Sequence, residues 1–200
     1  MVPSQSPSAR QHADHILTMN RPVIAFTGLI GSGKTTAAFR LIEEHNYRRI
    51  RFAGPLKDMT YAFGLSYEHI DGNLKEKPCD LLGGKTPREF MQLLGTEFGR
   101  NLIDPDIWIR AWGHAANQVP PGVGIVVDDC RFPNEAEAVR KLSNKSRIVR
   151  IIRKGQGTRQ AHVSELQQFG VDSILENDDG VEELYKKVDS LASRVANSHR

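Results

Sequence analysis

Residues Gly28–Thr35 read GLIGSGKT and match the pattern GxxxxGK[ST], directly after an apolar run at 23–26 that predicts a buried strand. Glycines in such a loop let the backbone turn tightly and aim consecutive N–H groups at phosphate oxygens. Lys34 would reach the β and γ phosphates, and the hydroxyl of Thr35 would bind Mg²⁺. The motif predicts a nucleoside triphosphate site rather than a glycine-rich turn with a chance lysine. The expected contacts are Gly28, Ile30, Gly31, Ser32, Gly33, Lys34, Thr35 and Thr36.

Two carboxylates, Asp128 and Asp129, end a second apolar run at 124–127. In phosphate-loop enzymes an aspartate at the end of the neighbouring strand holds Mg²⁺ together with the hydroxyl of the loop. We assign Asp128 to the metal and Asp129 to a catalytic or substrate role, although the sequence alone does not separate the two. The alternative is that both aspartates cap the helix that begins after Pro133.

Arg131 and Glu135 belong to the same predicted strand-to-helix turn. A planar guanidinium can hold a phosphate through two parallel hydrogen bonds, so Arg131 is a candidate catalytic and acceptor-binding residue. Glu135 is a candidate substrate contact. An ion pair between the two side chains, one helical turn apart, is an equally good structural explanation.

The elements that would position these residues alternate along the chain. Strands are expected near 22–27, 49–53, 123–129, 147–153 and 173–176, and helices over 33–46, 55–63, 87–101, 105–117, 133–143, 162–169 and 180–196. This order predicts an α/β fold with a mainly parallel five-stranded sheet, helices on both faces and ligands at the carboxyl ends of the strands. Residues 1–20 are polar and aperiodic, which predicts a disordered leader before one domain at 21–200.

Charge, cysteine content and the length of apolar segments argue against several classes of protein. The net charge is only +3, yet residues 131–160 hold nine Lys/Arg against two Glu, which suits an anionic small molecule more than nucleic acid. Cys79 and Cys130 lack metal-ligand spacing, so free thiols in a reducing cytoplasm are the simplest account. No apolar stretch is long enough for a membrane helix, and no signal peptide is visible.

Several further segments resemble the deoxynucleoside monophosphate kinases of tailed bacteriophages, a family of P-loop nucleoside-phosphate kinases. The likeness covers about residues 22–195. Besides the loop, it rests on FAGPLK at 52–57, KE at 75–76, GGK at 83–85, TPR at 86–88, QLLGTE at 92–97, GR at 99–100, Trp108 and DCRFPNE at 129–135. The resemblance implies a P-loop kinase fold with an acceptor-binding helical insertion at 55–117 and a basic lid at 153–170.

Arg88, Gln92, Thr96 and Gly99 recur at helical spacing, so they share one polar face of a helix. The resemblance implies that Arg88 holds the acceptor monophosphate and that Gln92 and Glu97 bind its base or sugar. Trp108 would stack on a ring, with core packing as an even alternative, and Lys57 is a weaker phosphate candidate. For Arg100 we expect a surface ion pair. The implied substrate-binding residues are Lys57, Arg88, Gln92, Thr96, Glu97, Trp108, Asp129, Arg131 and Glu135.

A basic connection around Gly155-Gln156-Gly157 is placed where such kinases carry a lid. Closure of a lid brings arginines over the phosphoryl group and excludes water. We expect Arg153, as a catalytic residue, and Arg159, as an ATP contact, to take part. Asn177, after the last strand, is placed where the adenine of ATP would lie.

The implied reaction is Mg²⁺-dependent transfer of the γ-phosphoryl group of ATP to a deoxynucleoside 5′-monophosphate, supplying diphosphates for phage DNA synthesis. The implied partners are nucleotides, with a possible homodimer. From the composition we expect a cytoplasmic location and neither stable nucleic-acid nor membrane binding. A kinase for another small acceptor, such as dephospho-coenzyme A, is the main alternative. A GTP switch lacks its Asn-Lys-x-Asp motif, because Asn144-Lys145 continues Ser146-Arg147. A nucleic-acid-binding module is least favoured by the modest charge.

Overall fold

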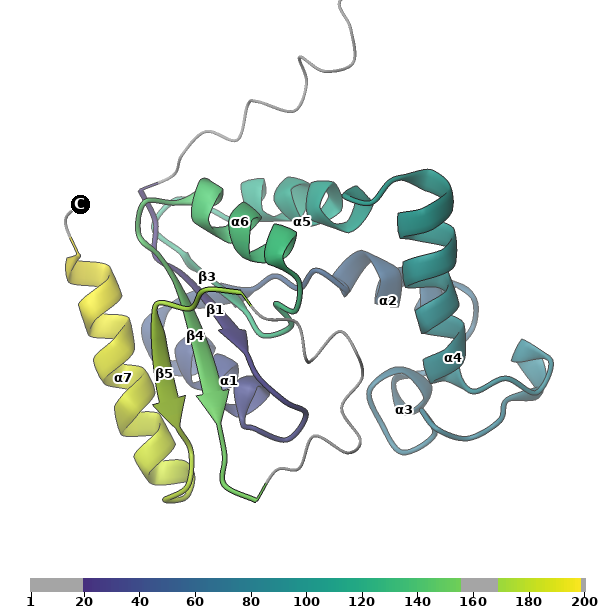
Figure 1. Ribbon diagram of the computed structural model, residues 1–200, viewed down its shortest axis with the longest axis horizontal. Coiled ribbons are helices and arrows are strands. Elements are labelled where there is room, and N and C mark those ends of the chain that lie inside the picture. The colour runs from purple at the N-terminus through teal and green to yellow at the C-terminus, as the bar shows by residue number, and fades with distance from the viewer. Residues whose placement is uncertain (1–19, 156–168, 199–200) are drawn as a thin grey trace, which may run out of the picture.

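The computed structural model describes residues 20–155 and 169–198, and a five-stranded parallel sheet lies at its centre (Figure 1). The strand order is β2-β3-β1-β4-β5, so β1 lies in the middle. Each neighbouring pair runs parallel, as predicted. The strands are β1 (Val23–Thr27), β2 (Tyr47–Arg49), β3 (Gly124–Val127), β4 (Ser146–Ile152) and β5 (Ser173–Glu176).

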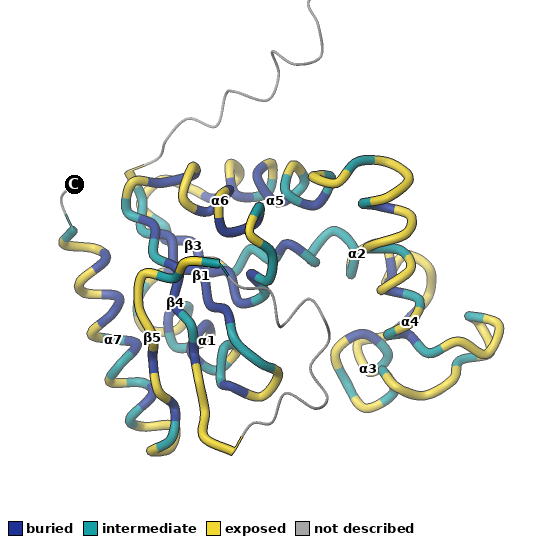
Figure 2. Tube along the Cα trace, viewed as in Figure 1, coloured by how far each residue is buried: buried dark blue, intermediate teal, exposed yellow. Residues whose placement is uncertain are grey.

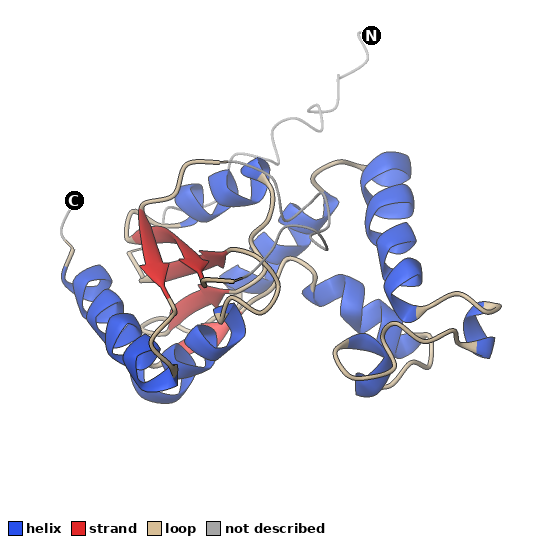
Figure 3. Cartoon of the chain, turned by 60° about the horizontal axis from the view of Figure 1, so that its bottom comes forward, coloured by secondary structure: helices blue, strands red, loops and turns tan. Residues whose placement is uncertain are grey.

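Helices cover both faces of the sheet (Figure 3). Alternate residues of β1 serve the two faces, as the pleat requires. Ile24 and Phe26 pack with residues of α1 (Lys34–His45) and α7 (Val181–Asn197). Val23 and Ala25 pack with residues of α5 (Ile107–Asn117) and α6 (Pro133–Leu142). The central strands are therefore buried on both sides, as Figure 2 shows.

A helical region projects beyond one end of the sheet, at the right of Figure 1. It contains α2 (Gly54–Ala62), α3 (Tyr67–Ile70), η2 (Asp80–Leu82), α4 (Pro87–Gln92) and η3 (Leu93–Ile103). A small core of its own, with Leu65, Ile70 and Met91 buried, holds it together. Thr86 and Glu89 cap the start of α4 reciprocally, since each side chain accepts the backbone N–H of the other.

Two elements differ from the sequence prediction. β2 lies at Tyr47–Arg49 rather than 49–53, because the N–H groups of Phe52 and Ala53 turn away to the carboxylate of Asp129. The helix expected over 87–101 continues to Ile103, but from Leu93 onward it is π-helical. The expected helix at 162–169 and leader at 1–20 fall almost entirely outside the described residues. No helix in the described part of the chain has the length and apolar character needed to cross a bilayer.

Leucine-to-alanine substitutions at a buried and an exposed site test this packing. Leu41 of α1 is completely buried in the sheet–helix core, whereas Leu102 of η3 is 79% exposed. We expect Leu41→Ala to lower the free energy of unfolding by about 3 kcal/mol through lost burial and the cavity left behind. Leu102→Ala, the matched control, should change it by less than about 0.5 kcal/mol. Urea denaturation measures both, and equal losses would contradict the described core.

Candidate active site

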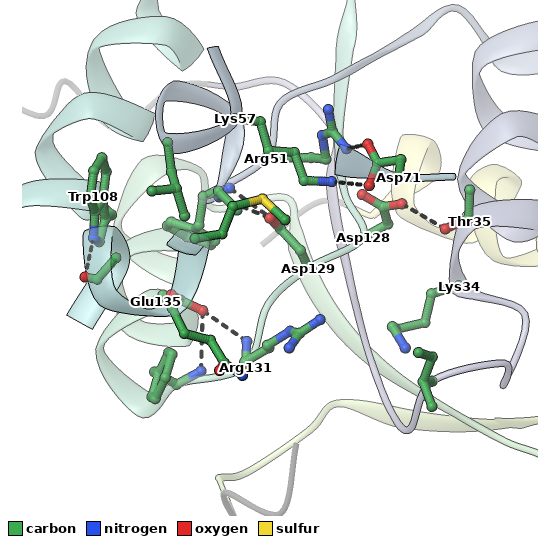
Figure 4. Close-up of a pocket in the computed structure, with 18 of the residues that line it drawn as sticks. Lys34, Thr35, Arg51, Lys57, Asp71, Trp108, Asp128, Asp129, Arg131 and Glu135 are labelled. Carbon is green, nitrogen blue, oxygen red and sulfur yellow. Dashed lines mark hydrogen bonds and ion pairs between the residues drawn. The ribbon is translucent and has the colours of Figure 1, made fainter. Parts of the chain in front are cut away.

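A cavity of about 590 Å³ opens where the loop after β1, the turn after β3 and the projecting helices meet. In Figure 4, Lys34 and Thr35 lie on one side of it and Trp108 on the opposite side, with Asp129, Arg131 and Glu135 between them. The carboxyl ends of parallel strands are where this class of fold binds ligands. Its lining combines residues of the loop after β1 with cationic side chains from the projecting helical region.

Three positions of the loop at 28–35 have backbone conformations that favour glycine. Gly28, Gly31 and Gly33 have φ values of +135°, +77° and +104°. A Cβ atom at Gly28 would lie 2.3 Å from the carbonyl oxygen of Ile151, and one at Gly33 would lie 2.4 Å from Nδ2 of Asn177. The loop is thus a close-fitting cradle that leads into the N-terminus of α1, which is the arrangement that binds phosphate.

The side chains of the loop are divided between the cavity and the core. Lys34 places its ammonium over the loop, where it donates to the carbonyl oxygens of Gly28 and Leu29, each at 2.7 Å. Ile30 and Thr36 line the cavity with Gly31, Gly33, Lys34 and Thr35. Gly28 and Ser32 do not line it. They shape the loop from behind instead, and Ser32 is completely buried.

Asp128 lies at the phosphate end and is only 4% exposed. The hydroxyl of Thr35 donates to Oδ2 of Asp128 over 3.1 Å. Arg49, the last residue of β2, donates from Nε to Oδ1 over 2.9 Å and from Nη2 to Oδ2 over 2.5 Å. A carboxylate beside a hydroxyl is the set of hard oxygen ligands that suits Mg²⁺. The geometry therefore fits the expected assignment of the metal to Thr35 and Asp128.

Asp129 has a different environment from its neighbour. Its two carboxylate oxygens accept the backbone N–H groups of Phe52, at 3.0 Å, and Ala53, at 2.9 Å. Burial raises the pKa of Asp129, and the negative charge of Asp128 adds to this, against the lowering effect of those hydrogen bonds. In this structure Asp129 fixes the segment that precedes α2, so a direct substrate contact stays a prediction. The helix cap considered for both aspartates is not formed by either.

Glu135 is buried at the start of α6 and holds the turn that carries Arg131. Its carboxylate accepts the backbone N–H groups of Arg131, at 2.8 Å, and Phe132, at 3.2 Å. It also accepts Nη2 of Arg100 over 2.9 Å, and the Arg100 guanidinium stacks 4.3 Å from the ring of Phe132. Burial raises the pKa of Glu135 to about 7. Arg100 therefore makes a largely buried ion pair at the cavity wall, and the expectation of a surface ion pair is wrong.

Arg131 extends its side chain into the cavity toward Lys34 (Figure 4). The position suits a guanidinium that bridges the two ends of the site. In the contacts with Glu135 described above, Arg131 uses its backbone N–H rather than the side chain proposed for a structural ion pair.

Further cations line the cavity. Lys57 and Arg51 both pair with Asp71, the latter at 3.4 Å, and Arg88 pairs with Glu76. Burial lowers the pKa of Lys57 despite its carboxylate partner. These ion pairs preorganise the cationic side chains at the cavity wall.

Lys75 also lines the cavity. Among the described residues, its ammonium makes no ion pair or hydrogen bond. Burial lowers its pKa, and the nearby charges of Lys57 and Arg88 lower it further. An amine held among other cations is a strong attractor of an anion. Lys75, Arg49 and Arg51 were not predicted as site residues, because only the folded chain brings them to the cavity. The pair Lys75-Glu76 within the resemblance was the one available signal.

The helix that follows these cations forms the wall expected for the acceptor. Gln92 and Thr96 line the cavity together with Arg100. Gly99 instead packs against Trp108, since a Cβ atom there would lie 2.6 Å from the indole ring. Trp108 is 6% exposed and donates its indole N–H to the carbonyl of Gly95 over 2.8 Å, so it is both core and cavity wall.

Glu97 does not fit its expected role. It is exposed, lies outside the cavity lining and accepts a hydrogen bond from Asn101 over 2.9 Å. Wider π-helical turns begin at Leu93, which turns Glu97 outward while Arg100 faces inward.

Asn177 also differs from its expected role. It is 9% exposed, and its amide donates to the carbonyl of Ser32 over 2.8 Å, so it supports the phosphate loop on the side away from the cavity.

Arg153 is exposed just after β4 and does not line the cavity. Arg159 and most of the expected lid lie outside the described residues.

Comparisons with known proteins show the family of the chain. A family model described as deoxynucleotide monophosphate kinase matches residues 84–188. A putative deoxynucleotide monophosphate kinase of Acanthamoeba polyphaga mimivirus is 33% identical, over 87% of this chain and 97% of its own length. The deoxynucleotide monophosphate kinase of Enterobacteria phage T4 is 22% identical, over 83% of this chain and 96% of its own length.

Solved structures support the fold alone. TT1252 from Thermus thermophilus superposes with a TM-score of 0.53 at 14% identity, covering 88% of this chain and 98% of that protein. A putative kinase from Chloroflexus aurantiacus gives a TM-score of 0.50 at 16% identity, covering 87% of this chain and 97% of that protein. The family model and the mimivirus relative show that the chain belongs to the deoxynucleotide monophosphate kinase family.

Proposed function

We propose that this protein transfers the γ-phosphoryl group of ATP to a deoxynucleoside 5′-monophosphate, giving the diphosphate for viral DNA synthesis. The observation that carries the proposal is one cavity with a phosphate loop at one end and an excess of cations throughout. The cationic lining residues are Lys34, Arg49, Arg51, Lys57, Lys75, Arg88, Arg100 and Arg131, against the acidic Asp71, Asp128, Asp129 and Glu135. Two polyanions meeting end to end require such a surplus.

The donor end suits the triphosphate of ATP with Mg²⁺. The loop cradle would hold the β-phosphate, and Lys34 would move from its carbonyl partners to the β and γ oxygens. Thr35 and Asp128 would hold Mg²⁺, which when bound supplies charge neutralisation of the phosphate oxygens. The preference for ATP over other triphosphates is an expectation from the family.

The acceptor end suits a nucleoside monophosphate. Arg88, Lys75 and Lys57 would share its phosphate, with Arg131 reaching the same group from the turn after β3. Gln92 and Thr96 offer hydrogen-bonding groups along the helical wall, and Trp108 closes that wall. Region 55–117 would therefore carry the acceptor, as its resemblance implies.

The transfer needs no general base, because the acceptor phosphate is already ionised. The protein's contribution is to align donor and acceptor and to stabilise negative charge on the transferring group with Lys34 and Arg131. Asp129 and Glu135 would act as positioning residues, since each holds a backbone segment that carries other site residues.

Three expectations extend beyond the described site. Arg153 and Arg159 would approach the phosphates when the lid at 153–170 closes. A homodimer is an expectation from the resemblance, which sedimentation of the purified protein would test, and a cytoplasmic location is an expectation from the free cysteines.

Rates of ADP release across the common deoxynucleoside and ribonucleoside monophosphates test the proposed reaction. We expect turnover with one or more deoxynucleoside monophosphates, and Lys34→Ala should lower kcat by about 10²-fold or more because a fixed charge on the phosphates is lost. Lys141→Ala, an exposed lysine of α6, should retain normal turnover. Turnover with dephospho-coenzyme A alone would show that the acceptor class is wrong, and full activity of Lys34→Ala would refute its role.

The acceptor role of Lys75 predicts a selective loss of affinity. Lys75→Ala should raise KM for the deoxynucleoside monophosphate roughly tenfold or more, because a hydrogen bond to a charged group is removed. KM for ATP should change little. Lys77→Ala, two residues away and exposed, is the matched control and should leave both values unchanged. Equal KM values for Lys75→Ala and the wild type would contradict the assignment.

The raised pKa of Glu135 predicts that the free energy of unfolding depends on pH. Its folded pKa of about 7 lies above the ordinary value of 4.5, so the folded state binds the proton more tightly. Its contribution is therefore complete below pH 4.5 and is lost as the pH rises through about 7. The loss is on the order of 3 kcal/mol, since one pKa unit corresponds to about 1.4 kcal/mol. Urea denaturation from pH 4.5 to 8 should show a shallower decline for Glu135→Gln, and identical slopes would contradict the shifted pKa.

A further inference from the structure

Arg49 makes the most enclosed ion pair at the donor end of the site. Its guanidinium grips both oxygens of Asp128, with Nε–Oδ1 at 2.9 Å and Nη2–Oδ2 at 2.5 Å. The Asp128 side chain is 2% exposed and that of Arg49 is 24% exposed. The ring of Phe39 lies 5.6 Å from the guanidinium and supports it. A buried carboxylate needs such a partner, because an unpaired charge in this environment is strongly unfavourable.

The same carboxylate has little capacity left for another partner. Oδ2 accepts both Nη2 of Arg49 and the hydroxyl of Thr35, which uses its two lone pairs. Oδ1 accepts Nε of Arg49. Oδ1 keeps one lone pair, but a divalent cation that bound Oδ2, the oxygen beside Thr35, would have to displace one of these donors. It would also lie next to a fixed positive charge, which repels it strongly at low dielectric.

We propose that Arg49 competes with the metal ion for Asp128 and so makes metal binding depend on the nucleotide. Without nucleotide, the guanidinium satisfies the carboxylate and keeps it directed at Thr35. With a triphosphate in the loop, phosphate oxygens supply further metal ligands and a second anionic partner for Arg49, which lines the same cavity. Arg49 is then a positioning residue that acts through Asp128. This inference rests on the metal site of the proposed function.

Binding of Mn²⁺ to the nucleotide-free protein, followed by electron paramagnetic resonance of the free ion, tests the competition directly. We expect Arg49→Gln to bind Mn²⁺ at least tenfold more tightly than the wild type, because the carboxylate loses its competing cation. Arg48→Gln is the matched control, being the same substitution at the exposed neighbouring position of β2, and should match the wild type. Adding Asp128→Asn to Arg49→Gln should abolish the gain.

A second variant covers the case in which Arg49→Gln does not fold. Arg49→Lys keeps the charge but loses the two-pronged contact, so it should bind Mn²⁺ about threefold more tightly than the wild type. Excess Mn²⁺ should also raise the melting temperature of either Arg49 variant more than that of Arg48→Gln. Unchanged Mn²⁺ affinity in the folded Arg49 variants would overturn the proposal. Because no nucleotide is present, this outcome is separate from any failure of the kinase assay.

Discussion

The parallel pairing of β1 with β3 is the constraint on which the site depends. Their register places Val23 opposite Ile125 and Ala25 opposite Val127, so β3 ends only two residues short of the end of β1, at the same edge of the sheet. The phosphate loop leaves one strand and Asp128 follows the other. Thr35 and Asp128 consequently come within hydrogen-bonding distance although 93 residues separate them in sequence. Complete burial of both strands keeps this register fixed.

Acidic residues in the cavity serve mainly to hold other groups in place. Asp129 fixes the backbone before α2, Glu135 fixes the turn that carries Arg131, and Asp71 holds Lys57 and Arg51. The cations are thereby arranged before a ligand arrives, which reduces the reorganisation needed when two phosphate groups approach. The paired carboxylates also limit mutual repulsion among the cations.

Much of the fold could be predicted from the sequence because it follows local patterns. Apolar runs marked the positions of four strands, whereas β2, with the sequence YRR, was expected at 49–53 and lies at Tyr47–Arg49. The loop motif with the following carboxylates marked the donor end. The acceptor wall was only partly predictable. An α-helical period places Arg88, Gln92, Thr96 and Gly99 on one face, whereas the cavity is lined by Arg88, Gln92, Thr96 and Arg100. The π-helical turns of η3 shift the face by one residue, and no local signal in the sequence indicates them.

The sequence also did not indicate the site residues that come from distant elements. Arg49 belongs to β2 and Lys75 to the segment after α3, and each reaches the cavity only through tertiary packing. Asn177 was placed by fold position alone, and its amide is instead used by the phosphate loop. Side-chain contacts of this kind depend on neighbours that periodicity cannot identify.

A crystal structure of the protein with ADP and a deoxynucleoside monophosphate bound together would test the two-ended site most directly. We expect the ADP phosphates in the loop at 28–35 and the acceptor phosphate within hydrogen-bonding distance of the guanidinium groups of Arg88 and Arg131. An acceptor bound elsewhere, with Arg88 still paired to Glu76 and neither arginine touching a ligand, would contradict it.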